Sequence, residues 1–130
     1  MTLFCYEKIL ITLILIFQIS FSFSQDYTID VTAKSKNDYK ISGKDLNGNT
    51  EGLDIDLNFA VGNKIIFNIN SPGHPFLIKL KPGTGKKNLV EGANNNGTAK
   101  GIIEWVPTEP GIYYYQCLKH KVMVGKIIIS

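Results

Sequence analysis

The sequence predicts an all-β protein, a sandwich or barrel of seven or eight short strands within residues 25–130. Short segments in which apolar and polar side chains alternate recur along the chain, and this period of two is typical of strands with one buried face. Residues that favour turns separate the segments. The sequence contains no amphipathic helix of convincing length and no internal repeat, so an antiparallel sandwich or barrel is the simplest architecture.

The first half of this region is expected to contain five strands, at residues 27–31, 39–41, 53–59, 64–70 and 76–80. Lys44 to Gly52 is expected to be a turn region, because Asn47-Gly48 is a dipeptide favoured in tight hairpins, where both residues tolerate positive φ. Asp54 and Asp56 fall on one face of the 53–59 strand. With no third hard ligand nearby, we interpret them as a solvated face rather than a calcium site.

The second half begins with a segment of different composition. Residues 81–100 contain Pro82-Gly83, further glycines and a run of asparagines but few apolar residues, which indicates a long surface loop. Strands are predicted at residues 102–106, 112–117 and 124–129. Their Ile, Val, Tyr and Trp side chains are expected to supply much of the core, with Tyr113–Tyr115 alternating across the sheet.

Residues 1–24 are predicted to be a signal peptide, and residues 25–130 a single exported domain. Lys8 precedes an apolar stretch, Ile9–Ile19, that is short for a membrane span of about 20 residues. Small residues then favour cleavage near Ser24. Export would place the protein in the periplasm, the extracellular space or the thylakoid lumen, as a monomer with no membrane span in the mature chain. An uncleaved N-terminal anchor is the alternative.

The charge of the chain excludes one class of partner. Its 14 basic residues, all lysines, and 11 acidic residues give a formal net charge of +3. This mild excess is far from the basic footprint of a nucleic-acid-binding protein, so nucleic acid is not expected as a partner.

The segment 111–127 concentrates side chains that bind metals. Cys117, His120 and Met123 stand three residues apart in it, and His74, the other histidine of the chain, lies between two prolines upstream. Removal of the signal peptide leaves Cys117 as the only cysteine, so it has no partner for an internal disulfide. Thiolate, imidazole and thioether are ligands that copper prefers. These four residues are therefore predicted to form one copper site.

The pattern Gly-x-Tyr-Tyr-Tyr-Gln-Cys-x-x-His-x-x-Met-x-Gly-x-Ile, with Gly-His-Pro-Phe upstream, resembles the cupredoxin (small blue copper protein) family. The ligand loop is amicyanin/plastocyanin-like, and its Cys-x-x-His-x-x-Met spacing is most similar to the short loop of amicyanin. The resemblance implies a Greek-key β-sandwich with one type 1 copper ion, Cu(I) or Cu(II). His74, Cys117 and His120 would be its equatorial ligands and Met123 its weak axial ligand. It also implies an electron carrier that meets redox partners near His120, not an enzyme.

Two neighbours of the histidines refine this prediction. Many cupredoxins have Asn after the first histidine, and its backbone N–H hydrogen-bonds the cysteine sulfur, whereas this chain has Pro75, which lacks an N–H. Loss of a donor to the thiolate favours Cu(II), so a lower reduction potential is expected. Lys119 and Lys121 flank His120, where they either steer an acidic redox partner or are simply solvated.

Other functions remain open from the sequence. A copper storage or delivery protein could use the same ligands, but it would release copper to a chelator, whereas a carrier would hold it. An extracellular binding or structural sandwich without a metal is a third interpretation. A multicopper oxidase needs more histidines, and a binuclear CuA centre needs a second cysteine in the loop. Zinc could bind the two histidines and the cysteine, but the placed methionine favours copper.

Overall fold

The computed structural model describes Ser20 and residues 25–130. The predicted signal peptide and its cleavage position near Ser24 lie outside these residues, Ser20 excepted. In the described part, no helix is long and apolar enough to cross a membrane. Nine strands follow one another there: β1 (Asp26–Thr32), β2 (Lys40–Asp45), β3 (Gly48–Leu53), β4 (Leu57–Phe59), β5 (Lys64–Asn70), β6 (Phe76–Lys79), β7 (Lys100–Trp105), β8 (Gly111–Cys117) and β9 (Val124–Ile129).

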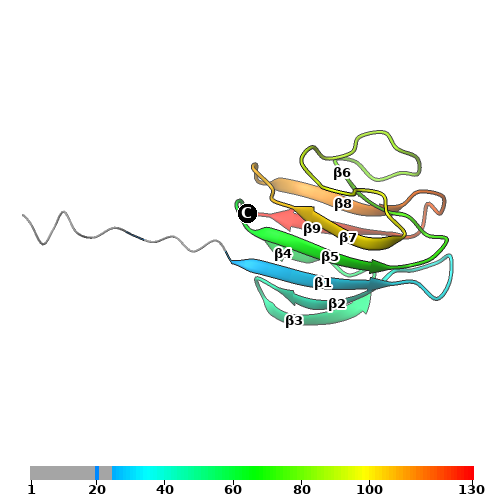
Figure 1. Ribbon diagram of the computed structural model, residues 1–130, viewed down its shortest axis with the longest axis horizontal. Helices are drawn as coiled ribbons and strands as arrows, with labels where there is room; N and C mark the ends of the chain where they lie inside the picture. The colour runs from blue at the N-terminus through cyan, green and yellow to red at the C-terminus, as the bar shows by residue number, and fades with distance from the viewer. Residues whose placement is uncertain (1–19, 21–24) are drawn as a thin grey trace, which may run out of the picture.

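The strands form two layers, which confirms the predicted all-β sandwich with slightly more strands than expected (Figure 1). One sheet has the order β3-β2-β1-β5-β7 and the other the order β4-β9-β8-β6. Most neighbours are antiparallel, but β1 pairs with β5 and β4 pairs with β9 in parallel. The expectation of a purely antiparallel sandwich is therefore wrong at these two pairings. Parallel neighbours need long connections, and here the intervening strands supply them.

The alternating apolar side chains fill the space between the two sheets. Tyr39, Phe76 and Tyr115 are fully buried and form an aromatic cluster within this core. The ring of Phe76 stacks on that of Tyr115, with centroids 5.3 Å apart, and meets the ring of Tyr39 edge-on at 5.1 Å. Phe76 is also the cross-strand partner of Cys117, so this tightly packed cluster supports the end of β8 that carries the cysteine.

The hairpin between β2 and β3 differs from the expected turn region at residues 44–52. β2 continues to Asp45 and β3 begins at Gly48, which leaves only Leu46 and Asn47 as the loop. Gly48 has the positive φ, 101°, that the turn requires. The Asp45 carboxylate accepts hydrogen bonds from the N–H groups of Asn47 (2.8 Å) and Asn58 (2.9 Å) and so fixes the turn.

The predicted strand at residues 53–59 is broken in the structure. β3 ends at Leu53 in one sheet and β4 begins at Leu57 in the other. Asp54 adopts a φ of 46°, a left-handed conformation that a continuous strand does not contain. Its Oδ1 accepts a hydrogen bond from the Tyr39 N–H (2.9 Å), and burial raises its pKa to about 6. The expectation that Asp54 belongs to a solvated strand face is therefore wrong.

The connection between β6 and β7, residues 80–99, is long, as expected, but it packs on the sheet. Leu89 forms an isolated β-bridge with Lys79, and Asn94 forms another with Glu104. The Asn96 carboxamide accepts a hydrogen bond from the Ile78 N–H (2.8 Å) and donates one to the Ile78 carbonyl (3.0 Å). A side chain thus satisfies the edge of β6, which would otherwise be open.

Strands β1, β5 and β8 run toward the same end of the sandwich, on the right in Figure 1. Thr32 and Asn70, the last residues of β1 and β5, are paired, and Cys117, the last residue of β8, pairs with Phe76. The connections at residues 33–39, 71–75 and 118–123 therefore lie together. We call this the ligand end, because it carries the predicted metal ligands.

Candidate metal centre

Cys117 reaches the ligand end as the last residue of β8. Its side chain is 0% exposed and belongs to the same hydrophobic cluster as Phe76. The thiol is free. The backbone N–H of Cys117 donates to the carbonyl of Met123 (2.9 Å), so the loop that follows the cysteine folds back on itself at once.

The loop that carries His74 is held on both sides of its backbone. The His74 N–H donates to the carbonyl of Ser71 (2.8 Å), and the Ser71 hydroxyl donates to the carbonyl of His74 (2.9 Å). The Tyr39 hydroxyl lies 3.0 Å from the carbonyls of both His74 and Pro75, which share its single proton. Burial raises the pKa of Tyr39, so this hydroxyl remains a donor.

The short loop at residues 118–123 is attached to the loop of the first histidine. The Leu118 N–H donates to the Pro75 carbonyl (3.2 Å), and the Met123 N–H donates to the His120 carbonyl (3.2 Å). These bonds fix the two histidine-bearing loops relative to each other. The tight turn therefore sets the position of His120 with respect to both His74 and Cys117.

The structure brings His74, Cys117 and His120 together, with one potential ligand atom of each within 4.8 Å of the others. The Nδ1 atoms of the two histidines are 3.2 Å apart. Cys117 Sγ lies 3.4 Å from Nδ1 of His120 and 3.9 Å from Nδ1 of His74. Both imidazoles thus present the same nitrogen to the sulfur, and the three residues can hold a metal ion.

The size of this triangle fits a metal at its centre. Metal–nitrogen bonds of about 2.0 Å and a metal–sulfur bond of about 2.3 Å, at 120° to one another, would separate the nitrogens by about 3.5 Å and sulfur from nitrogen by about 3.7 Å. The observed distances of 3.2, 3.4 and 3.9 Å lie on either side of these values. Two imidazoles and a thiolate in a plane are the equatorial set of blue copper sites.

Met123, the fourth predicted ligand, is 0% exposed and lies in the same core cluster as Cys117. Its backbone is hydrogen-bonded to both Cys117 and His120. Its role as an axial ligand stays a prediction from the spacing and the family resemblance.

The surroundings of His74 favour its neutral form. Burial lowers the pKa of His74, and the nearby His120 and Lys119 lower it further. A metal ion binds the neutral imidazole, because the coordinating nitrogen must offer a lone pair. His74 is therefore ready to bind a metal at neutral pH. Both histidines are partly exposed, whereas Cys117 is buried.

Exposed lysines surround the ligand end. Four of them lie in the connections at this end, and the fifth lies opposite Asn70 at the end of β5. They are Lys34, Lys36, Lys119, Lys121 and Lys100. The acidic residues in the connections at this end are Asp38, the partly buried Asp54 and the exposed Asp56. The ligand end therefore carries an excess of positive charge.

No protein-family model and no curated protein matches this chain. Solved structures do match. Rusticyanin from Thiobacillus ferrooxidans superimposes with a TM-score of 0.57 at 20% sequence identity, covering 82% of this chain and 78% of that chain. Reduced rusticyanin gives 0.53 at 18% identity, covering 82% and 80%. The chain has a cupredoxin fold. A purple cupredoxin from Nitrosopumilus maritimus also matches, at a TM-score of 0.41 and 23% identity over 58% of this chain and 77% of that chain.

Within this cupredoxin fold, sequence reasoning missed three polar residues that build the site. Tyr39 and Gln116 hold the backbones of the two ligand-bearing loops, and Lys79 is buried under the long connection. Two of them left a signal in the sequence. Lys79 interrupts an apolar strand, and Gln116 is the one non-aromatic polar residue between the tyrosines and Cys117.

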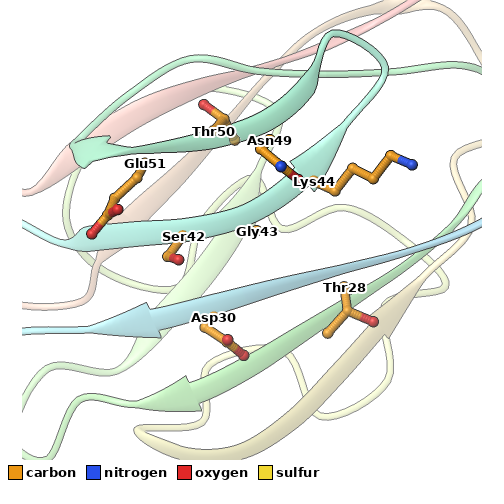
Figure 2. Close-up of a pocket in the computed structure, with 8 residues that line it drawn as sticks. All are labelled: Thr28, Asp30, Ser42, Gly43, Lys44, Asn49, Thr50 and Glu51. Carbon is orange, nitrogen blue, oxygen red and sulfur yellow. The ribbon is translucent and has the colours of Figure 1, made fainter.

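A hollow on the outer face of β1, β2 and β3 has a different chemistry (Figure 2). It has a volume of about 570 Å³, and Gly43 is one of the residues that line it. A Cβ at this position would overlap the carbonyl oxygen of Thr28. Hydroxyl, amide and carboxylate side chains line it, including Asp30 and Glu51, and none is a histidine or cysteine. It therefore contributes nothing to the candidate metal centre.

Proposed function

We propose that this protein is an exported type 1 (blue) copper protein that carries single electrons between redox partners. The observation that supports it most is the triangle of His74 Nδ1, His120 Nδ1 and Cys117 Sγ, with sides of 3.2 to 3.9 Å. In this proposal the three residues are the equatorial ligands and Met123 is the axial ligand. The likeness to rusticyanin, which is described as a copper protein, agrees with it.

Copper would supply a reversible one-electron change between Cu(II) and Cu(I). The chain would hold the ligands in place and keep water away from the metal. Cys117 and Met123 are fully buried, and the hydrogen bonds of Tyr39 and Ser71 hold the backbone of His74. Ligands fixed in this way move little when the charge of the metal changes, so electron exchange is fast. His120, partly exposed, offers the path to the surface.

A visible absorption spectrum of the domain titrated with Cu(II) tests this function. An intense thiolate-to-copper band that saturates at one equivalent, and is absent in Cys117→Ser, would support the type 1 site. Copper bound without that band, or lost to a chelator during redox cycling, would favour storage or delivery instead. No binding would leave a β-sandwich without a metal and refute the proposal.

The excess of lysines at the ligand end supports an acidic redox partner that docks near His120. Val122, which is 65% exposed in the same loop, offers an apolar contact within this basic rim. Steering by charge commonly changes association rates by about 10-fold or more at low salt. We therefore expect Lys119→Glu/Lys121→Glu to slow oxidation by hexacyanoferrate(III) by roughly 10-fold and to speed oxidation by a cationic cobalt(III) complex.

The matched control is Lys44→Glu/Lys64→Glu, which makes the same change in net charge at the opposite end of the sandwich. Lys44 lies opposite Asn49 near the β2–β3 hairpin, and Lys64 lies opposite Asp26 at the start of β1. Lys64 forms an exposed ion pair with Glu104 (3.8 Å), and the loss of such a pair costs little stability. This control is expected to change both rates much less. Equal effects of the two double variants would refute a docking surface near His120 without touching the electron-carrier proposal.

A further inference from the structure

Gln116 lies immediately before Cys117 and is 0% exposed, although glutamine is usually a surface residue. Its side chain lies on the face of the sheet opposite to the core and is covered by the connection between β6 and β7. We propose that Gln116 is the positioning residue of the ligand loop. Its carboxamide gathers the backbone carbonyls of Cys117, His120 and Met123, so that three of the four ligands of the proposed copper site are in place before a metal binds.

Backbone carbonyl groups of the ligand loop surround the nitrogen of this carboxamide. Gln116 Nε2 lies 3.0 Å from the carbonyl oxygen of His120, 3.2 Å from those of Cys117 and Met123, and 3.4 Å from that of Lys121. Two N–H groups are thus shared among four acceptors. Carbonyl oxygens that point at one another repel, and in a buried site they need donors. The loop can therefore curl this tightly only around a donor.

The oxygen of the carboxamide is held as well. The Gly83 N–H donates to Gln116 Oε1 (3.1 Å), which fixes the orientation of the amide. Lys79, 2% exposed, donates from Nζ to the carbonyls of Gly83 (2.6 Å) and Gly85 (3.0 Å), and the Gly85 N–H donates to the carbonyl of Leu118 (2.9 Å). The covering segment is thus attached to β6 on one side and to the ligand loop on the other.

The identity of residue 116 follows from these contacts. Methionine would fill the same space but would remove the side-chain donor from all four carbonyls, and those of His120 and Met123 would keep only a backbone N–H donor. Glutamate would keep the shape and place negative charge among them, which is worse. Only a side chain with two donors at its tip and an acceptor facing Gly83 satisfies every group. We therefore expect the order of the ligand loop to decrease from Gln to Met to Glu at residue 116. A residue that only filled space would not give this ranking, because methionine would then be as good as glutamine.

The test begins with the copper-free protein. Amide hydrogen exchange is measured by NMR at the N–H groups of Cys117 and Met123 in the parent and in Gln116→Met and Gln116→Glu. Losing about one net hydrogen bond corresponds to roughly 10-fold faster exchange, with a larger effect for Gln116→Glu. The control is Asn96→Leu, which removes a carboxamide that also donates and accepts, but on Ile78 of β6. It is expected to leave exchange in the ligand loop unchanged relative to the rest of the sheet.

Two further readouts complete the test. In the parent, the Nε2 protons of Gln116 are expected to exchange slowly before copper is added, which needs no variant to fold. In the copper-loaded Gln116→Met protein, we expect a shifted, broadened thiolate-to-copper band and roughly 10-fold faster copper release. Ligand-loop exchange in Gln116→Met equal to the parent, or fast Nε2 exchange in the parent, would overturn the proposal. Because exchange is measured without copper, these results stand even if the parent binds no copper.

Discussion

Asp54→Asn is expected to stabilise the protein at neutral pH. Burial raises the pKa of Asp54 from 3.8 to about 6, with Asp38 adding repulsion, although the Tyr39 N–H partly offsets this. Between about pH 4 and 6 the folded protein holds a proton that the unfolded chain has released, so stability falls as pH rises through this window. A pKa difference of about 2 corresponds to at most about 3 kcal/mol, and solvent screening of this partly exposed group reduces it to about 1 kcal/mol.

Asparagine removes this penalty without disturbing the backbone. Its Oδ1 can still accept the hydrogen bond from the Tyr39 N–H, and it tolerates the left-handed φ of residue 54. Urea denaturation of the copper-free variant and parent from pH 4 to 8 provides the measurement. The gain should be complete above pH 6 and absent near pH 4, whereas Asp56→Asn, at an exposed position, should change little. A gain that is the same at all pH values, or a loss at pH 7, would refute the electrostatic reasoning.

Three further predictions concern the surroundings of the site. In Pro75→Asn, a backbone N–H appears next to the strand pair that holds Cys117, and one net hydrogen bond to the thiolate should raise the reduction potential by about 50 mV; voltammetry giving an unchanged or lower value would contradict this. Gly125→Ala should destabilise by about 2 kcal/mol, because its Cβ would overlap the ring of Tyr115; unchanged thermal unfolding would mean that the ring moves freely. Tyr39→Phe removes the hydroxyl that the carbonyls of His74 and Pro75 share, leaving them only the Ser71 hydroxyl and the Leu118 N–H, and should cost about 1 kcal/mol; equal urea midpoints would show that water replaces the hydroxyl.

Much of this fold and site could be predicted because the information is local. Alternation located the strands, and the spacing of Cys117, His120 and Met123 placed three side chains on one strand and its loop. His74 could be added because the chain has only two histidines. The structure then brings its Nδ1 to within 3.9 Å of the cysteine sulfur. Spacing alone could not give the distance between these loops, which depends on how the two sheets pack.

What could not be predicted depends on contacts between distant segments. A period of two continues through Leu53 and Leu57, and nothing local reveals that Asp54 turns the chain from one sheet to the other. Gln116 and Lys79 look like solvent-facing polar positions, because the loop that covers them has almost no regular pattern. Lys79 donates to carbonyls of that loop, whereas Gln116 accepts from the Gly83 N–H and donates to carbonyls of the ligand loop. When the partners of a polar residue are backbone groups, no particular partner side chain is required, so the sequence contains no second residue that would reveal the contact.

The direction of β1 and β9 determines how this molecule can be tethered. β1 begins at Asp26, which pairs with Lys64, and β9 ends at Ile129, which pairs with Gly111. Both ends of the folded domain therefore lie opposite the ligand end, on the left in Figure 1. An attachment at either terminus, whether to a lipid surface, another domain or an electrode, would present His74 and His120 outward. Tethering and electron exchange would use opposite poles of the domain, so the first would not obstruct the second.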